Sequence, residues 1–171
     1  SIQKIEKYLK NKAPIQSILD IGCGNGFFTN ILSNYAEKVV GVDINLFELN
    51  QASSAFADNE KITWLCADIF DNSIFDSSEF DLITFCCSFQ YFSNIEQTVN
   101  RCFELLRPNG KIVIIDTAFY KDKEVYEAKQ RSLKYYQKMG FPELINQYHH
   151  HKMSDLKKYA YQNLFKKSVL D

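Results

Sequence analysis

The 171-residue sequence contains no apolar run near the ~18 residues needed to cross a membrane. Its polar opening segment, residues 1–12, lacks the apolar core of a signal peptide. A strong charge of one sign is also missing, since the formal net charge is −1 and the pI is near 6.3. Nucleic-acid and membrane-surface binding usually need a basic field. We therefore expect a cytoplasmic protein, monomeric or dimeric, that acts on a small molecule without nucleic-acid or membrane partners.

Metal-ligand spacing is missing as well. The odd set of five cysteines shows no C-x-x-C pattern and lies mostly in apolar stretches, so we expect buried, reduced thiols at Cys23, Cys66, Cys86, Cys87 and Cys102. Neighbours on a strand point to opposite faces, which argues against a redox or arsenic-binding pair at Cys86 and Cys87. The histidines at 149–151 would project in different directions from a helix, and we expect a solvated segment there. No metal site is predicted.

Short apolar runs alternate with longer helical patterns along the chain, a pattern typical of strand-helix-strand units. Five runs lack polar alternation, as in a sheet covered on both faces, and are predicted strands: Ser17–Ile21, Lys38–Asp43, Lys61–Ala67, Phe80–Cys86 and Lys111–Asp116. Helices are predicted at Phe27–Tyr35, Phe47–Ala57 and Ile95–Leu106, the last ended by the turn residues 107–110. Right-handed crossovers then give an α/β fold, a Rossmann-like, doubly wound, mostly parallel sheet in a three-layer α/β/α sandwich.

The composition changes near Asp116. Residues 1–116 hold 9 Lys/Arg against 15 Asp/Glu, whereas residues 117–171 hold 11 against 6 and include seven of the ten tyrosines. A helical pattern covers Lys123–Met139 in this second segment. The change marks a boundary between two parts of the chain.

Three glycines follow the first predicted strand, in Asp20-Ile21-Gly22-Cys23-Gly24-Asn25-Gly26, where open parallel sheets bind ligands. Such a turn brings the backbone close to a ligand, although it also serves as a mere tight connection. The second strand ends at Asp43, whose carboxylate can accept both hydroxyls of a ribose or can cap the next helix. A dinucleotide dehydrogenase shares these features, but its fingerprint is G-x-G-x-x-G, whereas this chain has G-x-G-x-G.

With these motifs, residues 15–116 resemble the class I S-adenosylmethionine-dependent methyltransferases, in particular the compact branch that includes ubiquinone-biosynthesis and other small-molecule enzymes. The matching motifs are Leu19-Asp20-Ile21-Gly22-Cys23-Gly24-Asn25-Gly26, Gly41-Val42-Asp43-Ile44, Cys66-Ala67-Asp68-Ile69, Phe80-Asp81-Leu82-Ile83-Thr84-Phe85-Cys86 and Leu106-Arg107-Pro108-Asn109-Gly110-Lys111. The resemblance implies an enzyme that transfers a methyl group from S-adenosylmethionine to a small molecule and releases S-adenosylhomocysteine.

The resemblance also assigns roles to single residues. It places Asp43 on the cofactor ribose, Ile44 on the adenine, and Asp68 as acceptor from the adenine amino group, although Asp68 could instead cap a short helix. These three side chains would supply the ribose acceptor, the apolar slot and the amino-group acceptor that adenosine needs. The full set of expected cofactor-binding residues is Asp20, Gly22, Cys23, Gly24, Asp43, Ile44, Ala67, Asp68, Ile69 and Cys86.

No acid or base motif of similar clarity is present, which fits methyl transfer, because that reaction mainly needs alignment and exclusion of water. Relatives often carry a histidine where this chain has Gln90 or Tyr91. These two residues are the catalytic and substrate-binding candidates, and the alternative is that they only cover the methionine end of the cofactor. The absence of an N-P-P-Y-like motif weakens the case for nucleic-acid or glutamine methylation.

Within this family an insertion after the fifth strand often closes over the substrate, so Phe119, Tyr120, Tyr135 and Tyr136 are expected in an acceptor pocket. The alternative is that the basic helices dock on the acidic core or face solvent. We expect one domain with a cofactor-binding core at 15–116, a helical lid at 117–153, and a last helix and possible sixth strand at 154–171.

Family members end with a sixth and a seventh strand, of which residues 164–170 supply at most one, so the C-terminal hairpin is expected to be incomplete. This shortened edge and the missing base sustain a second hypothesis. In it the chain is a catalytically silent cofactor-binding scaffold that acts with a partner protein.

Overall fold

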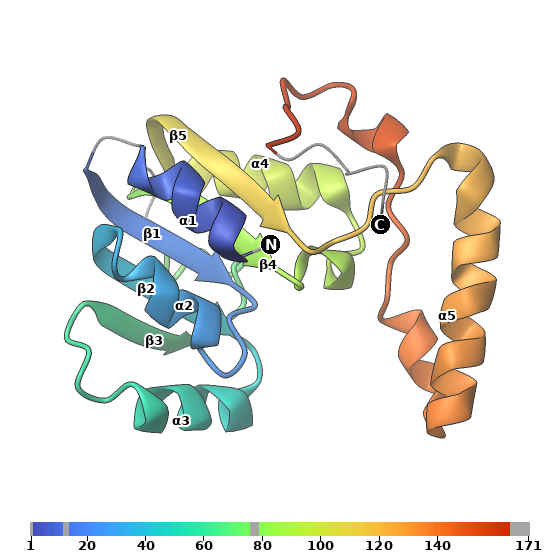
Figure 1. The fold of residues 1–171 in the computed structure, drawn as a ribbon, viewed down its shortest axis with the longest axis horizontal. Helices are drawn as coiled ribbons and strands as arrows, with labels where there is room; N and C mark the ends of the chain where they lie inside the picture. Colours follow the sequence, from blue (N-terminus) through green and yellow to red (C-terminus); the bar gives the residue numbers. More distant parts are fainter. Residues whose placement is uncertain (1, 12–13, 76–78, 165–171) are drawn as a thin grey trace. The chain divides into compact units, whose positions relative to one another are not determined.

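The computed structural model describes residues 2–11, 14–75 and 79–164, and the chain divides into two compact units, residues 1–117 and 118–171. The first unit is built on a parallel five-stranded sheet of order β3-β2-β1-β4-β5 (Figure 1). The strands are β1 (Ile15–Ile21), β2 (Ala36–Asp43), β3 (Ile62–Cys66), β4 (Phe80–Cys86) and β5 (Leu106–Ile115). Because the winding reverses between β1 and β4, the carboxyl ends of these two strands mark the expected ligand position.

Helices cover both faces of this sheet, as the two-sided burial of its strands requires. Figure 1 shows α1 and α2 in front of the sheet and α4 behind it. The helices are α1 (Ile2–Lys10), α2 (Phe27–Leu32), α3 (Leu46–Ala55) and α4 (Ile95–Leu105). The predicted Rossmann-like doubly wound sheet is thus confirmed. Helix α1 was not predicted, although Ile5 and Leu9 give it a buried stripe.

Aromatic packing fills the core beneath the end of β4. The rings of Phe85 and Phe89 are fully buried and meet edge to face with centroids 4.9 Å apart. Phe92 adds a second edge contact to Phe85 at 5.4 Å. Such pairs contribute about 0.5–1.5 kcal/mol beyond the area they bury. They anchor the segment that follows β4, which borders the candidate site.

Strand β5 begins five residues earlier than predicted. The expected turn at 107–110 lies inside the strand as an irregularity, because Phe80 pairs with Leu106 while Leu82 pairs with Lys111. Asn109 has a φ of 68°, in the left-handed region, so the chain bulges there and resumes pairing. At the other end Asp116 lies outside the strand, where its φ of 53° ends the extended conformation.

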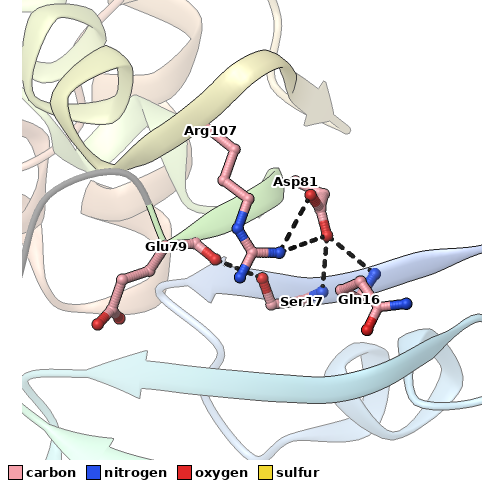
Figure 2. Close-up of polar contacts among 5 residues, drawn as sticks. All are labelled: Gln16, Ser17, Glu79, Asp81 and Arg107. Atoms are coloured by element: carbon pink, nitrogen blue, oxygen red, sulfur yellow. Dashed lines mark hydrogen bonds and ion pairs between the residues drawn. The ribbon is translucent and has the colours of Figure 1, made fainter.

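A polar cluster ties the strands together at the amino edge of the sheet, opposite the ligand edge (Figure 2). The Asp81 carboxylate accepts the backbone N–H groups of Gln16 and Ser17 at 2.8 and 2.9 Å. Arg107 donates to the same carboxylate at 3.2 Å, and the Ser17 hydroxyl donates to the Glu79 carbonyl at 2.5 Å. This cluster joins β1, β4 and β5 and has a structural role.

Within its described residues, the second unit contains α5 (Val125–Met139), three short 3-10 turns and one isolated β-bridge between Tyr120 and Lys152. Helix α5 ends at Gly140, whose φ of 83° makes a left-handed cap. Of the last helix expected within 154–171, the described residues contain only the 3-10 turn Met153–Leu156. The expected sixth strand lies outside the described residues except for Leu164. No helix of the described ranges is long and apolar enough to span a bilayer.

The expectation of a solvated histidine segment was wrong. His150 and His151 are only 7% and 5% exposed. The segment is not helical. The Tyr120 N–H donates to the His151 carbonyl at 2.9 Å, and the Met153 N–H donates to the Tyr120 carbonyl at 2.8 Å. Aromatic rings enclose both imidazoles, Phe119 against His151 and Tyr120 against His150. Burial lowers the pKa of His150 below its usual value.

Candidate functional site

The glycine-rich loop after β1 runs along the carboxyl ends of β1 and β2. Gly22 and Cys23 donate their backbone N–H groups to the Val42 carbonyl at 2.8 and 3.1 Å. Gly22 has a φ of 69°, and a Cβ there would lie 2.5 Å from the Cβ of Ser88. This close approach joins the loop after β1 to the segment after β4. The glycine is therefore required both by conformation and by space.

The last glycine of the motif has a packing role. Gly26 begins α2 with a φ of 77°, and an added Cβ would collide with the Trp64 ring. Helix α2 is only six residues long, so the tight fit of its start against β3 sets its position. Gly26 is the last residue of the predicted motif, and its contacts with Trp64 and Ala52 give it a role in the fold.

Asp43 ends β2 and braces the glycine loop. Its Oδ2 accepts the Gly24 N–H at 2.8 Å and its Oδ1 accepts the Asn45 N–H at 2.8 Å. Helix α3 is capped by Asn45, which accepts from the Phe47 and Glu48 N–H groups. Asp43 is therefore not the helix cap. A carboxylate has about four acceptor positions, so two remain for the hydroxyls of a ribose.

Ile44 and Asp68 offer an apolar surface and an acceptor beside Asp43. Ile44, directly after β2, is 77% exposed and so presents an apolar side chain at the strand end. Asp68 is also exposed, and its Oδ1 accepts the Phe70 N–H at 3.0 Å in a turn rather than at the start of a helix. The Ala67 N–H donates to the Asp43 carbonyl at 3.1 Å and holds the two strand ends together.

Ile69 was expected among the cofactor-binding residues, and its side chain is buried in the first unit. Its carbonyl accepts the Nε–H of buried Arg101 at 2.7 Å. The side chain therefore packs in the core beneath the turn. A contact of Ile69 with a ligand would have to come from its backbone.

Asp20 is the most buried carboxyl of the site. Its two oxygens accept the hydroxyls of Thr29 at 2.6 Å and Thr84 at 2.7 Å, from α2 and β4. Burial raises its pKa from 3.8 to about 6, the two hydroxyl bonds oppose this rise, and Asp43 adds to it. With 1% exposure its side chain positions the loop and is not open to a ligand.

Cys86 and Cys87 were expected to point to opposite faces, and this was wrong. Cys87 follows the strand with a φ of 55°, and the two sulfur atoms lie within 4.8 Å of each other. The expectation of buried thiols was also wrong for Cys66 and Cys87, which are exposed, whereas Cys102 is buried. Burial and the neighbouring Cys87 raise the pKa of Cys86 to about 12, and burial likewise raises that of Cys23.

Gln90 is buried and both ends of its amide are occupied. The amide nitrogen donates to the Cys87 carbonyl at 2.5 Å, and the amide oxygen accepts the Thr117 hydroxyl at 2.7 Å. These two bonds hold the amide against Cys87 and Thr117 within the protein. Tyr91 is exposed in the 3-10 turn Phe89–Tyr91 and stays a candidate for the acceptor.

The four aromatic residues expected at the acceptor lie in the second unit. Phe119 and Tyr120 pack on the buried histidines described above. The rings of Tyr135 and Tyr136 meet edge to face at 5.5 Å on α5, and Tyr135 is largely exposed. Phe119 and Tyr120 therefore belong to the packing of this unit, while Tyr135 is open to solvent.

Several supporting residues escaped the sequence analysis. They are hydroxyl side chains that fix the loops: Ser88 donates to the Ile21 carbonyl at 2.6 Å, and Thr29 and Thr84 hold Asp20. A threonine inside the apolar run of β4 was the available signal, because a buried hydroxyl needs a partner. Ser88 had no comparable signal, since its partner is a backbone carbonyl.

The arrangement is thus a loop with left-handed glycines at the switch point, a bracing aspartate on the next strand and an exposed apolar residue beside it. The sequence profile of the family described as a methyltransferase domain matches residues 19–114, which include all of these features. The chain belongs to this family. The resemblance to class I S-adenosylmethionine-dependent methyltransferases is confirmed, and S-adenosylmethionine is the cofactor of the family.

The match between this methyltransferase domain and its named relatives covers only part of each relative's length. A malonyl-[acyl-carrier protein] O-methyltransferase of Anoxybacillus flavithermus is 32% identical over 102 residues, 58% of this chain and 38% of the relative. A ubiquinone biosynthesis O-methyltransferase of Coxiella burnetii is 26% identical over 109 residues, 62% of this chain and 46% of the relative. The matched part of the chain thus spans less than half the length of these relatives.

Solved structures share the fold. The YcgJ protein of Bacillus subtilis matches with a TM-score of 0.74 at 19% identity, over 92% of this chain and 66% of its own. The N-methyltransferase NodS of Bradyrhizobium japonicum, in complex with S-adenosyl-L-homocysteine, matches with a TM-score of 0.56 at 23% identity, over 66% of this chain and 57% of its own.

Proposed function

We propose that this chain transfers a methyl group from S-adenosylmethionine to a small-molecule acceptor, with the cofactor held at the carboxyl edge of β1, β2 and β3. The observation that carries the proposal is the geometry of Asp43. Its carboxylate braces the glycine loop through Gly24 and still has free acceptor positions at the switch point of the sheet.

The described residues fit adenosine in shape and chemistry. Asp43 would accept the two ribose hydroxyls, the exposed Ile44 would pack on the adenine, and the exposed Asp68 carboxylate would accept its amino group. Gly22 and Gly24 lack the Cβ atoms that would collide with Ser88 and Glu48, so the loop can follow its left-handed path at the strand ends. We assign Asp20 a positioning role behind this loop, and Cys23, Ala67 and Cys86 a place along its border.

When bound, the cofactor supplies a methyl group on a positively charged sulfur that is open to in-line attack. The chain itself then has to align the acceptor and keep water away, for which no dedicated acid or base is needed. Tyr91 is the exposed polar side chain at the end of β4 that we propose for orienting the acceptor. Gln90 holds that segment in place through Cys87 and Thr117.

Two relatives named as O-methyltransferases support an oxygen atom as acceptor. Their names also argue against the catalytically silent scaffold, which no feature of the structure favours. The acceptor itself follows from neither the fold nor the motifs, since one fold serves many acceptors.

The experiment incubates the full chain with S-adenosylmethionine and a panel of acceptors that includes carboxylates and phenols, and measures the formation of S-adenosylhomocysteine over long times. We expect acceptor-dependent formation of S-adenosylhomocysteine that is lost in Asp43→Ala and kept in Asp81→Ala, a matched aspartate at the opposite edge. Tight cofactor binding without product from any acceptor would contradict the proposed enzyme.

A further inference from the structure

Three potential metal ligands converge where β4 and β5 end. The sulfur atoms of Cys86 and Cys87 and a carboxylate oxygen of Asp116 all lie within 4.8 Å of one another. Within the part of the chain that the structure describes, no other group of three His, Cys, Asp or Glu residues comes together in this way. The proposed methyl transfer uses neither Cys87 nor Asp116.

The backbone creates this convergence. Cys86 pairs with Ile115, and the Cys87 N–H donates to the Ile115 carbonyl at 3.0 Å, which fixes the two strand ends side by side. Cys87 and Asp116 then both adopt the left-handed conformation, with φ of 55° and 53°. Few residues other than glycine do so, and Cys87 would otherwise point to the opposite face from Cys86.

We propose that Cys86, Cys87 and Asp116 form a site for one divalent cation of the zinc type. Two sulfur ligands and one carboxylate oxygen suit a borderline-soft cation, whereas Mg²⁺ and Ca²⁺ prefer oxygen ligands alone. Two sulfurs bound to one tetrahedral Zn²⁺ lie about 3.8 Å apart, so the present spacing needs only small side-chain rotations.

Exposure and charge agree with this assignment. Cys87 and Asp116 are exposed, which gives the cation an entry path and leaves a fourth position open to solvent. Three protein ligands and one open position are the composition of catalytic zinc sites. A bound cation would also offset the charge of the Asp116 carboxylate.

The test is metal binding by the full chain, with neither cofactor nor acceptor present, so that its result is independent of the proposed methyl transfer. The protein is kept in a non-thiol reductant, stripped with a chelator and titrated with Co²⁺ and then Zn²⁺. We expect one Co²⁺ per chain with thiolate-to-cobalt charge-transfer absorption, and its displacement by one Zn²⁺.

Cys87→Ser should weaken Zn²⁺ binding by about 100-fold and remove most of the charge-transfer absorption. Asp116→Asn should weaken binding by about tenfold while the absorption stays, because both sulfurs remain. Cys66→Ser, which changes an exposed cysteine at the end of β3, is the matched control and should bind as wild type. Thermal melting by circular dichroism checks that each variant is folded.

Two results would overturn the site. One is a wild-type chain that binds Co²⁺ without charge-transfer absorption. The other is a folded Cys87→Ser or Asp116→Asn variant with unchanged Zn²⁺ affinity. Since both changed side chains are exposed, at least one of these variants should fold and decide the question.

Discussion

Asp43 and Asp81 each accept two backbone N–H groups, yet they lie at opposite edges of the same sheet. Asp81 joins the amino ends of β1 and β4 and pairs with Arg107, so its acceptor positions are spent within the protein. Asp43 stands at the carboxyl edge next to an exposed isoleucine and keeps acceptor capacity. Position in the sheet, more than the number of hydrogen bonds, distinguishes the structural Asp81 from the candidate ligand-binding Asp43.

This contrast predicts the outcome of two matched substitutions. Asp43→Ala should weaken S-adenosylhomocysteine binding by about 2–4 kcal/mol, or roughly 30- to 1000-fold, because two charge-assisted hydrogen bonds to the ribose are lost. Asp81→Ala should lower the free energy of unfolding but leave the affinity of the folded protein unchanged. Calorimetry on both variants provides the measurement. Equal affinities for wild type and folded Asp43→Ala would refute the ribose assignment.

The raised pKa of Asp20 leads us to expect that the free energy of unfolding depends on pH. Its pKa is raised from 3.8 to about 6 in the folded state, so the folded protein binds its proton more tightly than the unfolded chain does. The contribution is present below pH 3.8 and is lost as the pH rises to about 6. Between pH 4 and 7, urea unfolding should show wild type losing up to about 3 kcal/mol relative to Asp20→Asn, which keeps both hydroxyl partners. A difference that does not change with pH would show that the Asp20 pKa is ordinary.

The two loops of the site form one packed element, because Gly22 of the first touches Ser88 of the second. Gly22→Ala should therefore cost about 2–4 kcal/mol, from the left-handed backbone and from the collision with Ser88. Gly140→Ala is the control, since Gly140 has a similar φ of 83° but open space around it, and it should cost about 1 kcal/mol. Urea unfolding of both variants separates strain from collision, and equal losses would mean that the loops are not packed together.

Much of the first unit could be predicted from the sequence because its strands are buried on both faces. Continuous apolar runs such as Phe80–Cys86 have few alternatives, and their order along the chain leads to the doubly wound sheet. The glycine motif and Asp43 could likewise be predicted to lie at one edge, because parallel strands place their carboxyl ends together.

Other features depend on backbone conformations and contacts that the residue types alone do not predict. Nothing in a Pro-Asn-Gly sequence distinguishes a turn between elements from the irregularity inside β5. The positive φ of Cys87 reverses the direction of its side chain, and a strand pattern cannot predict this. His150 and His151 are buried because Phe119, Tyr120 and Tyr148, distant or adjacent in sequence, enclose them.

The chain as a whole combines an acidic unit that holds the cofactor motifs with a basic, tyrosine-rich unit beyond residue 117. We propose that the second unit serves the acceptor and not the cofactor, and that Tyr135 and Tyr136 carry this role. The double variant Tyr135→Ala, Tyr136→Ala should lower kcat/KM for the acceptor by roughly 10- to 100-fold, because aromatic walls position a substrate and exclude water.

Two controls accompany this prediction. Cofactor affinity by calorimetry should stay within about twofold of wild type. Tyr126→Ala removes another exposed ring from α5 and should leave acceptor use unchanged. A joint fall of cofactor affinity, acceptor use and melting temperature in the double variant would instead show that these tyrosines stabilise the fold.

A crystal structure of the full chain with S-adenosylhomocysteine would test most directly whether this methyltransferase domain holds its cofactor at Asp43 and Ile44. We expect both ribose hydroxyls within about 2.5–3.0 Å of the Asp43 carboxylate, the adenine against Ile44 and its amino group at Asp68. A ligand bound elsewhere, or an Asp43 that contacts only Gly24 and Asn45 in the occupied protein, would contradict this expectation.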